Sequence, residues 1–371
     1  MQFIDLQAQL AHIRPAIDAR IAKVLDHGKF IMGPEVFELE KKLAEYVGIK
    51  HCISCANGTD ALQLSLMALD IGPGDTVITT AFSFFSTAEV IPLVGATPYF
   101  VDIIPSTYNI CPEALQAGIH NARKQGLKPK AVIAVDMFGL PANYPEIQAI
   151  CDKEGLYLIE DAAQGFGGSI NGQNAGSFGD IATTSFFPAK PLGCYGDGGA
   201  IFTDSDELAT LCESLRVHGK GEHKYQNMRI GLNSRLDTIQ AAILLEKLGH
   251  FPQELIQRQK AATHYSTELA AVFVTPAIPE GYQSSWAQYT VTPKKGKRDN
   301  WMSSLKKAGI PTAVYYPIGL NKQVALQHYP SDPTPITERL CEQVFSLPMH
   351  GYLDHQQVDN IINIINATNP I

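Results

Sequence analysis

The sequence lacks a long run of basic residues and a long run of apolar residues. Its 371 residues carry 29 Lys and Arg against 37 Asp and Glu, a net charge of −8, and charges of the two signs are interspersed. Nucleic acid is therefore not an expected partner. No apolar stretch is long enough to cross a bilayer, and residues 1–7 have neither the basic flank nor the apolar core of a signal peptide. We expect no membrane association and a cytoplasmic location.

The sequence also lacks a set of cysteine pairs and a glycine-rich nucleotide-binding turn. The seven cysteines are an odd number at scattered positions, which is typical of a reducing compartment. Cys52 and Cys55 have the spacing of a redox or zinc site, but neither a second pair nor a suitable histidine accompanies them. We interpret them as residues of a buried strand and expect no metal site. No Gly-x-Gly-x-x-Gly turn follows an early strand, which argues against a nicotinamide-dependent oxidoreductase.

What the chain does contain is a series of short apolar strands separated by helices. A helix is expected to begin at Pro34 and to end at Gly48. Strands are expected at residues 52–55, 76–79, 97–102, 131–136, 156–161 and 181–186. All-apolar strands alternating with helices indicate an α/β protein with a mostly parallel central sheet and helices on both faces. Ligands bind beyond the carboxyl ends of the strands in such sheets.

The length and the 45% hydrophobic content indicate two domains. A helix at 234–248 is expected to end before Pro252, and a second helix is expected at 253–269. We therefore place a large domain with an N-terminal arm at residues 1–250 and a smaller α+β domain at residues 251–371. The smaller domain should contain strands near 288–291 and 312–315 and helices near 300–308 and 336–344.

Lys190 is the most informative residue, because it follows Ser185-Phe186-Phe187-Pro188-Ala189 and precedes Pro191 and glycines. A lysine held in such surroundings can lose its charge and become a nucleophilic amine, although a loop lysine is usually solvated. Asp161 ends the apolar run 156–161, where it could also be a helix cap. Pyridoxal 5'-phosphate (PLP) needs a lysine for its aldehyde and a carboxylate for its pyridinium nitrogen.

Other segments fit a cofactor phosphate. Ala56-Asn57-Gly58-Thr59 joins a strand to an apolar helix, so it presents a helix N-terminus that could bind an anion; by itself Asn-Gly is more often a turn. Phe84 could be a core residue, Ser185 an ordinary strand hydroxyl, and Asn233 part of a helix cap. The order of these segments in one chain favours a common site.

That order resembles the sugar aminotransferases of the DegT/DnrJ/StrS family, which use PLP on fold type I, the aspartate aminotransferase-like fold. The resemblance extends from Phe3 to His350 and rests on residues 56–62, 160–164, 185–190, 196–199 and 231–237. It implies transfer of an amino group, with glutamate as the expected donor, to a nucleotide-linked keto-sugar in surface polysaccharide biosynthesis, such as that of lipopolysaccharide O-antigen. Histidine in place of the lysine marks the family's dehydratases, so Lys190 argues against that activity.

The resemblance implies a role for each matching residue around the cofactor ring. Lys190 would be the Schiff-base lysine and the proton shuttle. Asp161 would hold the pyridinium nitrogen, Gln164 would lie beside the ring hydroxyl, and Phe84 would stack on the ring. Ala189, where a hydroxyl residue is frequent, departs from the family's pattern without bearing on the chemistry.

The resemblance also implies a phosphate cradle formed by Gly58, Thr59 and Ser185. Asn233 would reach the phosphate from the neighbouring subunit, so the active unit would be a homodimer with two shared sites. Tyr316 would line the sugar pocket. Gly319, where proline is common, is a departure close to that pocket.

Within the family, residues 52–58, 191–196, 230–235 and 320–323 most resemble members that aminate C3 of UDP-2-acetamido-2-deoxy-3-oxo-D-glucuronate. That substrate is anionic at its diphosphate and its carboxylate, which makes Arg229, Arg235 and Lys322 candidate binders; each could instead be a solvated or structural cation. The alternatives are amination at C4, amination of a UDP- or dTDP-linked keto-6-deoxy sugar, and a non-catalytic regulator on the same fold.

Overall fold

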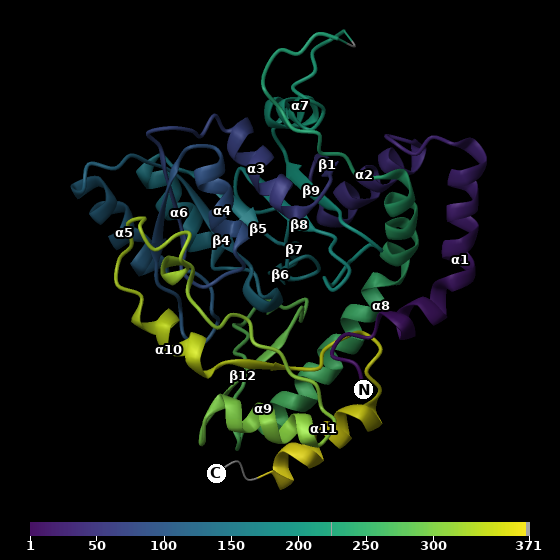
Figure 1. Ribbon diagram of the computed structural model, residues 1–371, viewed down its shortest axis with the longest axis vertical. Helices are drawn as coiled ribbons and strands as arrows, with labels where there is room; N and C mark the ends of the chain where they lie inside the picture. Colours follow the sequence, from purple (N-terminus) through teal and green to yellow (C-terminus); the bar gives the residue numbers. More distant parts are fainter. Residues whose placement is uncertain (224, 369–371) are drawn as a thin grey trace.

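The computed structural model describes residues 1–223 and 225–368 of the chain. A seven-stranded sheet with the order β1-β9-β8-β5-β4-β2-β3 forms its centre (Figure 1). β9 runs antiparallel to both of its neighbours, and the other pairs are parallel. The mostly parallel sheet is therefore confirmed. Its strands are β1 (His51–Cys55), β2 (Thr76–Thr80), β3 (Thr97–Val101), β4 (Pro129–Val135), β5 (Tyr157–Asp161), β8 (Ile181–Ser185) and β9 (Gly199–Thr203).

Helices cover both faces of this sheet because successive strand residues point to opposite sides. In β4, Ala131 and Ile133 belong to one apolar core, whereas Val132 and Ala134 belong to another. The first core is closed by α3 (Gly58–Ala68), α4 (Ser86–Leu93) and α7 (Asp206–Leu215). The opposite face is covered by α2 (Pro34–Val47), α5 (Pro112–Lys124), α6 (Tyr144–Glu154) and α8 (Thr238–Leu269).

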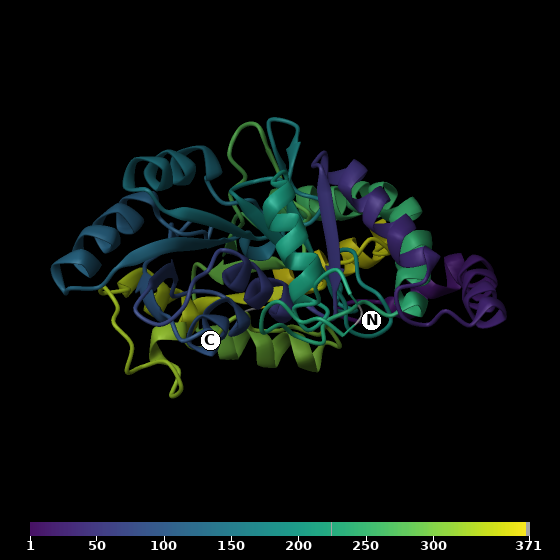
Figure 2. The same ribbon diagram turned by 90° about the horizontal axis from the view of Figure 1, so that it is seen from above.

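The N-terminal helix α1 (Leu6–His27) lies at one edge of the molecule (Figure 2). It packs on α8 through Ile13, Ile17 and Ile243. The next helix, α2, begins at Pro34 and ends at Gly48, whose φ of 84° is the left-handed conformation that favours glycine. The predicted bounds of α2 are thus confirmed.

The C-terminal region has an apolar core of its own, built from residues between 261 and 365. It contains an antiparallel sheet of β10 (Phe273–Val274), β12 (Tyr289–Pro293) and β13 (Phe345–Leu347), with α9 (Arg298–Lys307), α10 (Pro335–Gln343) and α11 (His355–Ala367). A small sheet of β11 (Tyr282–Gln283), β6 (Ser169–Ile170) and β7 (Gln173–Asn174) links this region to the large one. Two short 3-10 helices are Met137–Gly139 and Leu320–Lys322. The domain boundary at residue 250 remains a prediction.

Three predicted elements were wrong. The two helices expected at 234–248 and 253–269 are one helix, α8, which begins only at Thr238 and continues through Pro252. Ser234 is held outside the helix because its N–H donates to the Arg216 carbonyl and its Oγ accepts from Ala56 N. The strand expected at 312–315 is reduced to a single bridge between Ala313 and Ser346.

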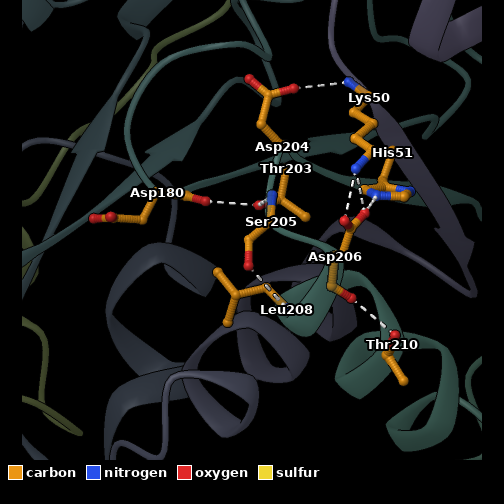
Figure 3. A network of polar contacts seen from close by, with 9 residues as sticks. All are labelled: Lys50, His51, Asp180, Thr203, Asp204, Ser205, Asp206, Leu208 and Thr210. Carbon is orange, nitrogen blue, oxygen red and sulfur yellow. Dashed lines mark hydrogen bonds and ion pairs between the residues drawn. The ribbon is translucent and has the colours of Figure 1, made fainter.

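A network of polar contacts fixes the turn from β9 to α7 (Figure 3). The carboxylate of Asp206 pairs with Lys50 and His51 at the start of β1. Asp204 accepts from Lys50 N at 2.8 Å, and Thr203 Oγ1 donates to the carbonyl of Asp180 before β8. This network lies at the amino ends of β1 and β8, so it supports the sheet at the edge opposite the carboxyl ends. In the part of the chain that the structure describes, no helix is both long enough and apolar enough to span a membrane.

Candidate active site

The predicted cofactor residues gather where strands of the central sheet end. Asp161 is the last residue of β5, Ser185 is the last residue of β8, and Gly58 opens α3 soon after β1. Lys190 follows β8 by one short turn, in which its N–H donates to the Phe187 carbonyl at 2.8 Å. Because the carboxyl ends of parallel strands meet at one edge, these side chains come from distant parts of the sequence to the same place.

Asp161 is buried, with 4% of its surface exposed. Its Oδ2 accepts a hydrogen bond from Thr87 Oγ1 at 2.8 Å, and its Oδ1 accepts from Ala163 N at 3.2 Å. Burial raises the pKa of Asp161, while the bond from Thr87 and the charge of Lys190 act to lower it. A local cap therefore accounts for only one of the two carboxylate oxygens.

Lys190 lies within electrostatic reach of Asp161. Burial lowers the pKa of Lys190, and the negative charge of Asp161 partly opposes that shift. A lowered pKa increases the share of the neutral amine, which is the nucleophilic and proton-accepting form. The structure thus combines a weakly stabilised ammonium with a carboxylate at the same edge of the sheet.

Gln164, Tyr316 and Phe84 form a second group beside this pair. Gln164 Nε2 donates to Tyr316 Oη at 3.2 Å, and Gln164 Oε1 accepts from Phe138 N at 2.7 Å. The ring of Phe84 lies 6.2 Å from that of Tyr316, and Phe84 is 53% exposed. Burial and then the charge of Asp161 raise the pKa of Tyr316, so this tyrosine of the C-terminal region lies close to the carboxylate.

Gly58, Thr59 and Ser185 enclose the N-terminus of α3. A Cβ added at Gly58 would lie 2.7 Å from the Ser185 Cβ, so only glycine allows this approach. Asn57 caps the helix by accepting from Asp60 N at 2.8 Å. Thr59 Oγ1 and Ser86 Oγ are 2.7 Å apart. Free helix N–H groups and hydroxyls in one place are suited to a phosphate.

Asn233 and Arg235 are brought together, but not with Lys190. Asn233 is exposed and Arg235 is half-buried. Both line a cavity of about 410 Å³, whose other lining residues are Ile31, Ala56, Gly196, Asp197, Asp237 and Gln240. Ala56 precedes the cradle at Gly58, so this cavity adjoins the phosphate end of the site.

The remaining predicted cations lie apart from the others in the single chain. Arg229 is exposed on the segment that extends beyond α7 (Figure 1), and its Nη1 donates to Ser214 Oγ at 2.8 Å. Lys322 is exposed and forms an ion pair with Glu338, with 3.0 Å between Nζ and Oε1. Within one chain, neither contacts the cavity at Arg235.

Sequence reasoning missed Ser86, Thr87 and Lys247. The signal for the first two was a group of hydroxyl residues around Phe84 at a helix start. Lys247 is only 2% exposed; it donates to the Gly193 carbonyl, and its Nζ lies 4.2 Å from the centre of the Tyr195 ring. Burial lowers the pKa of Lys247 to about 8. The buried Lys247 thus holds the segment that follows Lys190.

A pair of buried carboxyl groups lies behind Asp161. Asp136 Oδ1 accepts from Tyr144 Oη at 2.7 Å, and Glu160 accepts from two backbone N–H groups at 2.8 Å each. Burial raises the pKa of Asp136 to about 7, and burial together with the charge of Asp136 raises that of Glu160. The pair therefore retains a proton near neutral pH. Asp136 N also donates to the Asp161 carbonyl at 3.1 Å.

These residues fit PLP, because one edge of the sheet offers a lysine, a buried carboxylate and a cradle that a Cβ at Gly58 would fill. The fold and the site together define a PLP-dependent aminotransferase of fold type I. The chain belongs to the DegT/DnrJ/EryC1/StrS aminotransferase family, whose family model matches residues 11–366. The resemblance seen in the sequence and the PLP cofactor are thereby confirmed.

Several relatives span nearly the whole chain. It is 51% identical over 355 residues, 95% of this chain and 96% of the relative, to the UDP-2-acetamido-2-deoxy-3-oxo-D-glucuronate aminotransferase of Pseudomonas aeruginosa. It is 41% identical, over 98% of this chain and 97% of the relative, to a UDP-N-acetyl-3-dehydro-alpha-D-glucosamine 3-aminotransferase of Acidithiobacillus ferrooxidans. A pleiotropic regulatory protein of Geobacillus stearothermophilus is 42% identical, over 98% of this chain and 96% of the relative.

Solved structures share the fold along the whole chain. A DegT DnrJ EryC1 StrS aminotransferase from Brucella abortus superposes with a TM-score of 0.97 at 51% identity, covering 99% of this chain and 98% of that one. DesV of S. venezuelae, in complex with a ketimine intermediate, gives a TM-score of 0.93 at 33% identity, covering 98% and 97%.

Proposed function

We propose that the chain is a nucleotide-sugar aminotransferase that aminates C3 of UDP-2-acetamido-2-deoxy-3-oxo-D-glucuronate. Glutamate is the proposed amino donor, and surface polysaccharide biosynthesis in the cytoplasm is the proposed setting. The observation that carries the transaminase chemistry is the buried Asp161 beside Lys190. The substrate is supported by the 51% identity to a relative named for this sugar. The seven free cysteines support a reducing compartment.

Each residue has a proposed task. When bound, PLP supplies an electron sink for the carbon from which a proton is removed. Lys190 takes and returns that proton, for which its lowered pKa is suited. Asp161 keeps a proton on the ring nitrogen through a charge-assisted hydrogen bond. Gln164 lies beside the ring hydroxyl, and Phe84 covers one face of the ring.

The phosphate end of the site is proposed to need two chains. Gly58, Thr59 and Ser185 would hold the phosphate from one subunit, and Asn233 would reach it from the other. The exposed position of Asn233 supports this arrangement, as do the apolar side chains of Met228 and Ile230, which are 60% and 88% exposed on the same segment. Exposed apolar side chains close together are typical of a surface that a second copy covers.

The proposed substrate contacts are cationic. Arg235 lines the cavity beside the cradle, so it is the favoured partner of a substrate anion. Arg229 and Lys322 would take part if the second subunit or the bound sugar brought them close. Tyr316, which bonds Gln164, would line the sugar pocket.

The reverse half-reaction tests the substrate, because amino-sugar products are stable. The UDP-linked 3-amino-uronate should convert the cofactor to its amine form, and added 2-oxoglutarate should then be released as glutamate. The corresponding 6-deoxy dTDP-sugar should react much more slowly, because the missing carboxylate leaves cations unpaired. Arg235→Ala should narrow that difference, with Arg123→Ala, which removes a cation of α5 that pairs with Glu154, as the matched control. If the 6-deoxy sugar reacts as fast or faster, the substrate assignment is wrong and the aminotransferase assignment still holds. If no amino sugar reacts, a regulatory role is favoured over an enzyme.

A further inference from the structure

Three side chains that commonly ligate metals meet between two helices of the C-terminal region. His264 lies on α8, and His355 and Asp359 lie on α11. His264 Nε2 is 2.7 Å from Asp359 Oδ1, and His355 Nδ1 is 2.8 Å from Asp359 Oδ2. The centres of the two imidazole rings are 4.8 Å apart. Two ring nitrogens therefore point at one carboxylate.

The backbone holds this group in place. A capping box at Asp354 fixes the start of α11. His355 and Asp359 are four residues apart in this helix and therefore lie one turn apart on the same face. Val358 and Ile362 of α11 share an apolar core with Ala261 and Tyr265 of α8. Ligands on two packed helices are positioned more firmly than ligands on loops.

We propose that His264, His355 and Asp359 bind one divalent transition-metal ion of the Zn²⁺ class, with water at the remaining positions. Two imidazoles and one carboxylate are a donor set that zinc and its neighbours accept, whereas Mg²⁺ and Ca²⁺ prefer oxygen donors alone. The ring nitrogens that now face Asp359 would become the ligand atoms; each neutral ring would keep its one proton on the other nitrogen, and only the second proton of a charged ring would pass to water.

The present distances allow this coordination. All three ligand atoms lie within 4.8 Å of one another. A tetrahedral zinc ion, with bonds of about 2.0–2.2 Å, needs its ligand atoms roughly 3.3 Å apart. The longest separation must therefore shorten by roughly 1.5 Å, and the three side chains, which are 30%, 78% and 45% exposed, leave room for the rotations that this needs. His264 and Asp359 are 95 residues apart, so spacing along the chain gave no sign of this site.

A calorimetric titration of the tag-free, PLP-loaded protein with ZnCl₂, after treatment with a chelator, tests the proposal. We expect one ion per chain at this site, and dissociation constants at least tenfold weaker in His264→Ala and in His355→Ala. His328→Ala, which removes an exposed histidine elsewhere, is the matched control and should bind as the unchanged protein does. Cys111→Ser should also bind normally, because that half-buried thiol is not a ligand. Mg²⁺ should produce no signal.

Two further readouts separate a metal site from simple His–Asp hydrogen bonds. Co²⁺ should give visible absorption bands that His264→Ala loses. Zn²⁺ should raise the Tm of the unchanged protein and of the two controls but not that of His264→Ala or His355→Ala, because the ion joins α8 to α11. All variants should keep their Tm without metal and their turnover. Zn²⁺ binding that persists in the His264→Ala/His355→Ala double variant, or no binding by the unchanged protein, would overturn the proposal.

Discussion

Thr87 Oγ1 donates a hydrogen bond to Asp161 Oδ2 at 2.8 Å, across 74 positions of sequence. The preceding residue, Ser86, lies 2.7 Å from the hydroxyl of Thr59. Ser86 and Thr87 both lie in the first turn of α4. Two adjacent residues thus fix the distance between the buried carboxylate and the phosphate cradle, which are the two ends that PLP must reach at once.

Removal of the Asp161 charge should impair catalysis far more than folding. Asp161→Asn cannot hold a proton on the ring nitrogen, so we expect the rate to fall by roughly two orders of magnitude or more. Thr87→Val removes one neutral donor and should lower the rate by about tenfold. Ser83→Ala is the control, because the Ser83 hydroxyl that it removes hydrogen-bonds to Thr87 and not to Asp161. Unchanged turnover in a folded, PLP-loaded Asp161→Asn would show that Asp161 is only a local cap.

The purified protein should be yellow, and borohydride should attach the cofactor covalently to Lys190. Peptide mass spectrometry decides between Lys190 and Lys247, since burial lowers the pKa of both. We expect no label on Lys247, because it is bonded to the Gly193 carbonyl beneath the Tyr195 ring. Lys190→Ala should lose all transamination while retaining its fold. Measurable turnover by that variant would refute the assignment.

The buried pair of Asp136 and Glu160 should make stability depend on pH. The folded-state pKa of Asp136, about 7, lies above its ordinary value of 3.8, so the folded state binds more protons between these values. Stability from this group is present below about pH 4 and is lost as the pH rises through 7. Asp136→Asn removes this titration, so the stability of the variant relative to that of the unchanged protein should increase as the pH rises from about 4 to 7. Denaturant titrations at several pH values measure the difference in unfolding free energy between the two proteins. If that difference is the same at every pH, the prediction is contradicted.

A site shared between subunits predicts complementation. Lys190→Ala and Asn233→Ala should each be inactive alone. In a mixed dimer, one site would combine the intact Lys190 of one chain with the intact Asn233 of the other. After subunit exchange, random pairing should restore about a quarter of the original activity. A fully active monomer in dilute solution, or no recovery despite proven exchange, would rule out the shared site.

Much of the parallel sheet was predictable because its strands bury both faces and therefore read as apolar runs. β2, β3, β4, β5 and β8 all lie within two residues of their expected bounds. The strand expected at 312–315 failed for a local reason. Tyr315 and Tyr316 both pack against the core around Phe82 instead of alternating between two faces.

The cofactor residues could be located from the sequence because each one sits in a distinctive local segment. The residues that support them could not be located in this way. Thr87 and Lys247 act through residues 74 and 54 positions away, so only the fold reveals their partners. Pro252 was misleading for a related reason. Packing of Leu245 and Phe251 on one side and of Ala261 and Tyr265 on the other outweighs the loss of one helical hydrogen bond.

The continuity of α8 restricts how this protein can be recombined with its relatives. The helix runs unbroken from the rim of the Arg235 cavity to the C-terminal core, a length of about 48 Å for its 32 residues. A chimera joined at residue 250 would unite two half-helices from different parents and mismatch both apolar cores that they enter. Grafting a foreign C-terminal region to change sugar preference instead requires a junction in the turn between Leu269 and Phe273, where the rod has ended and β10 has not begun.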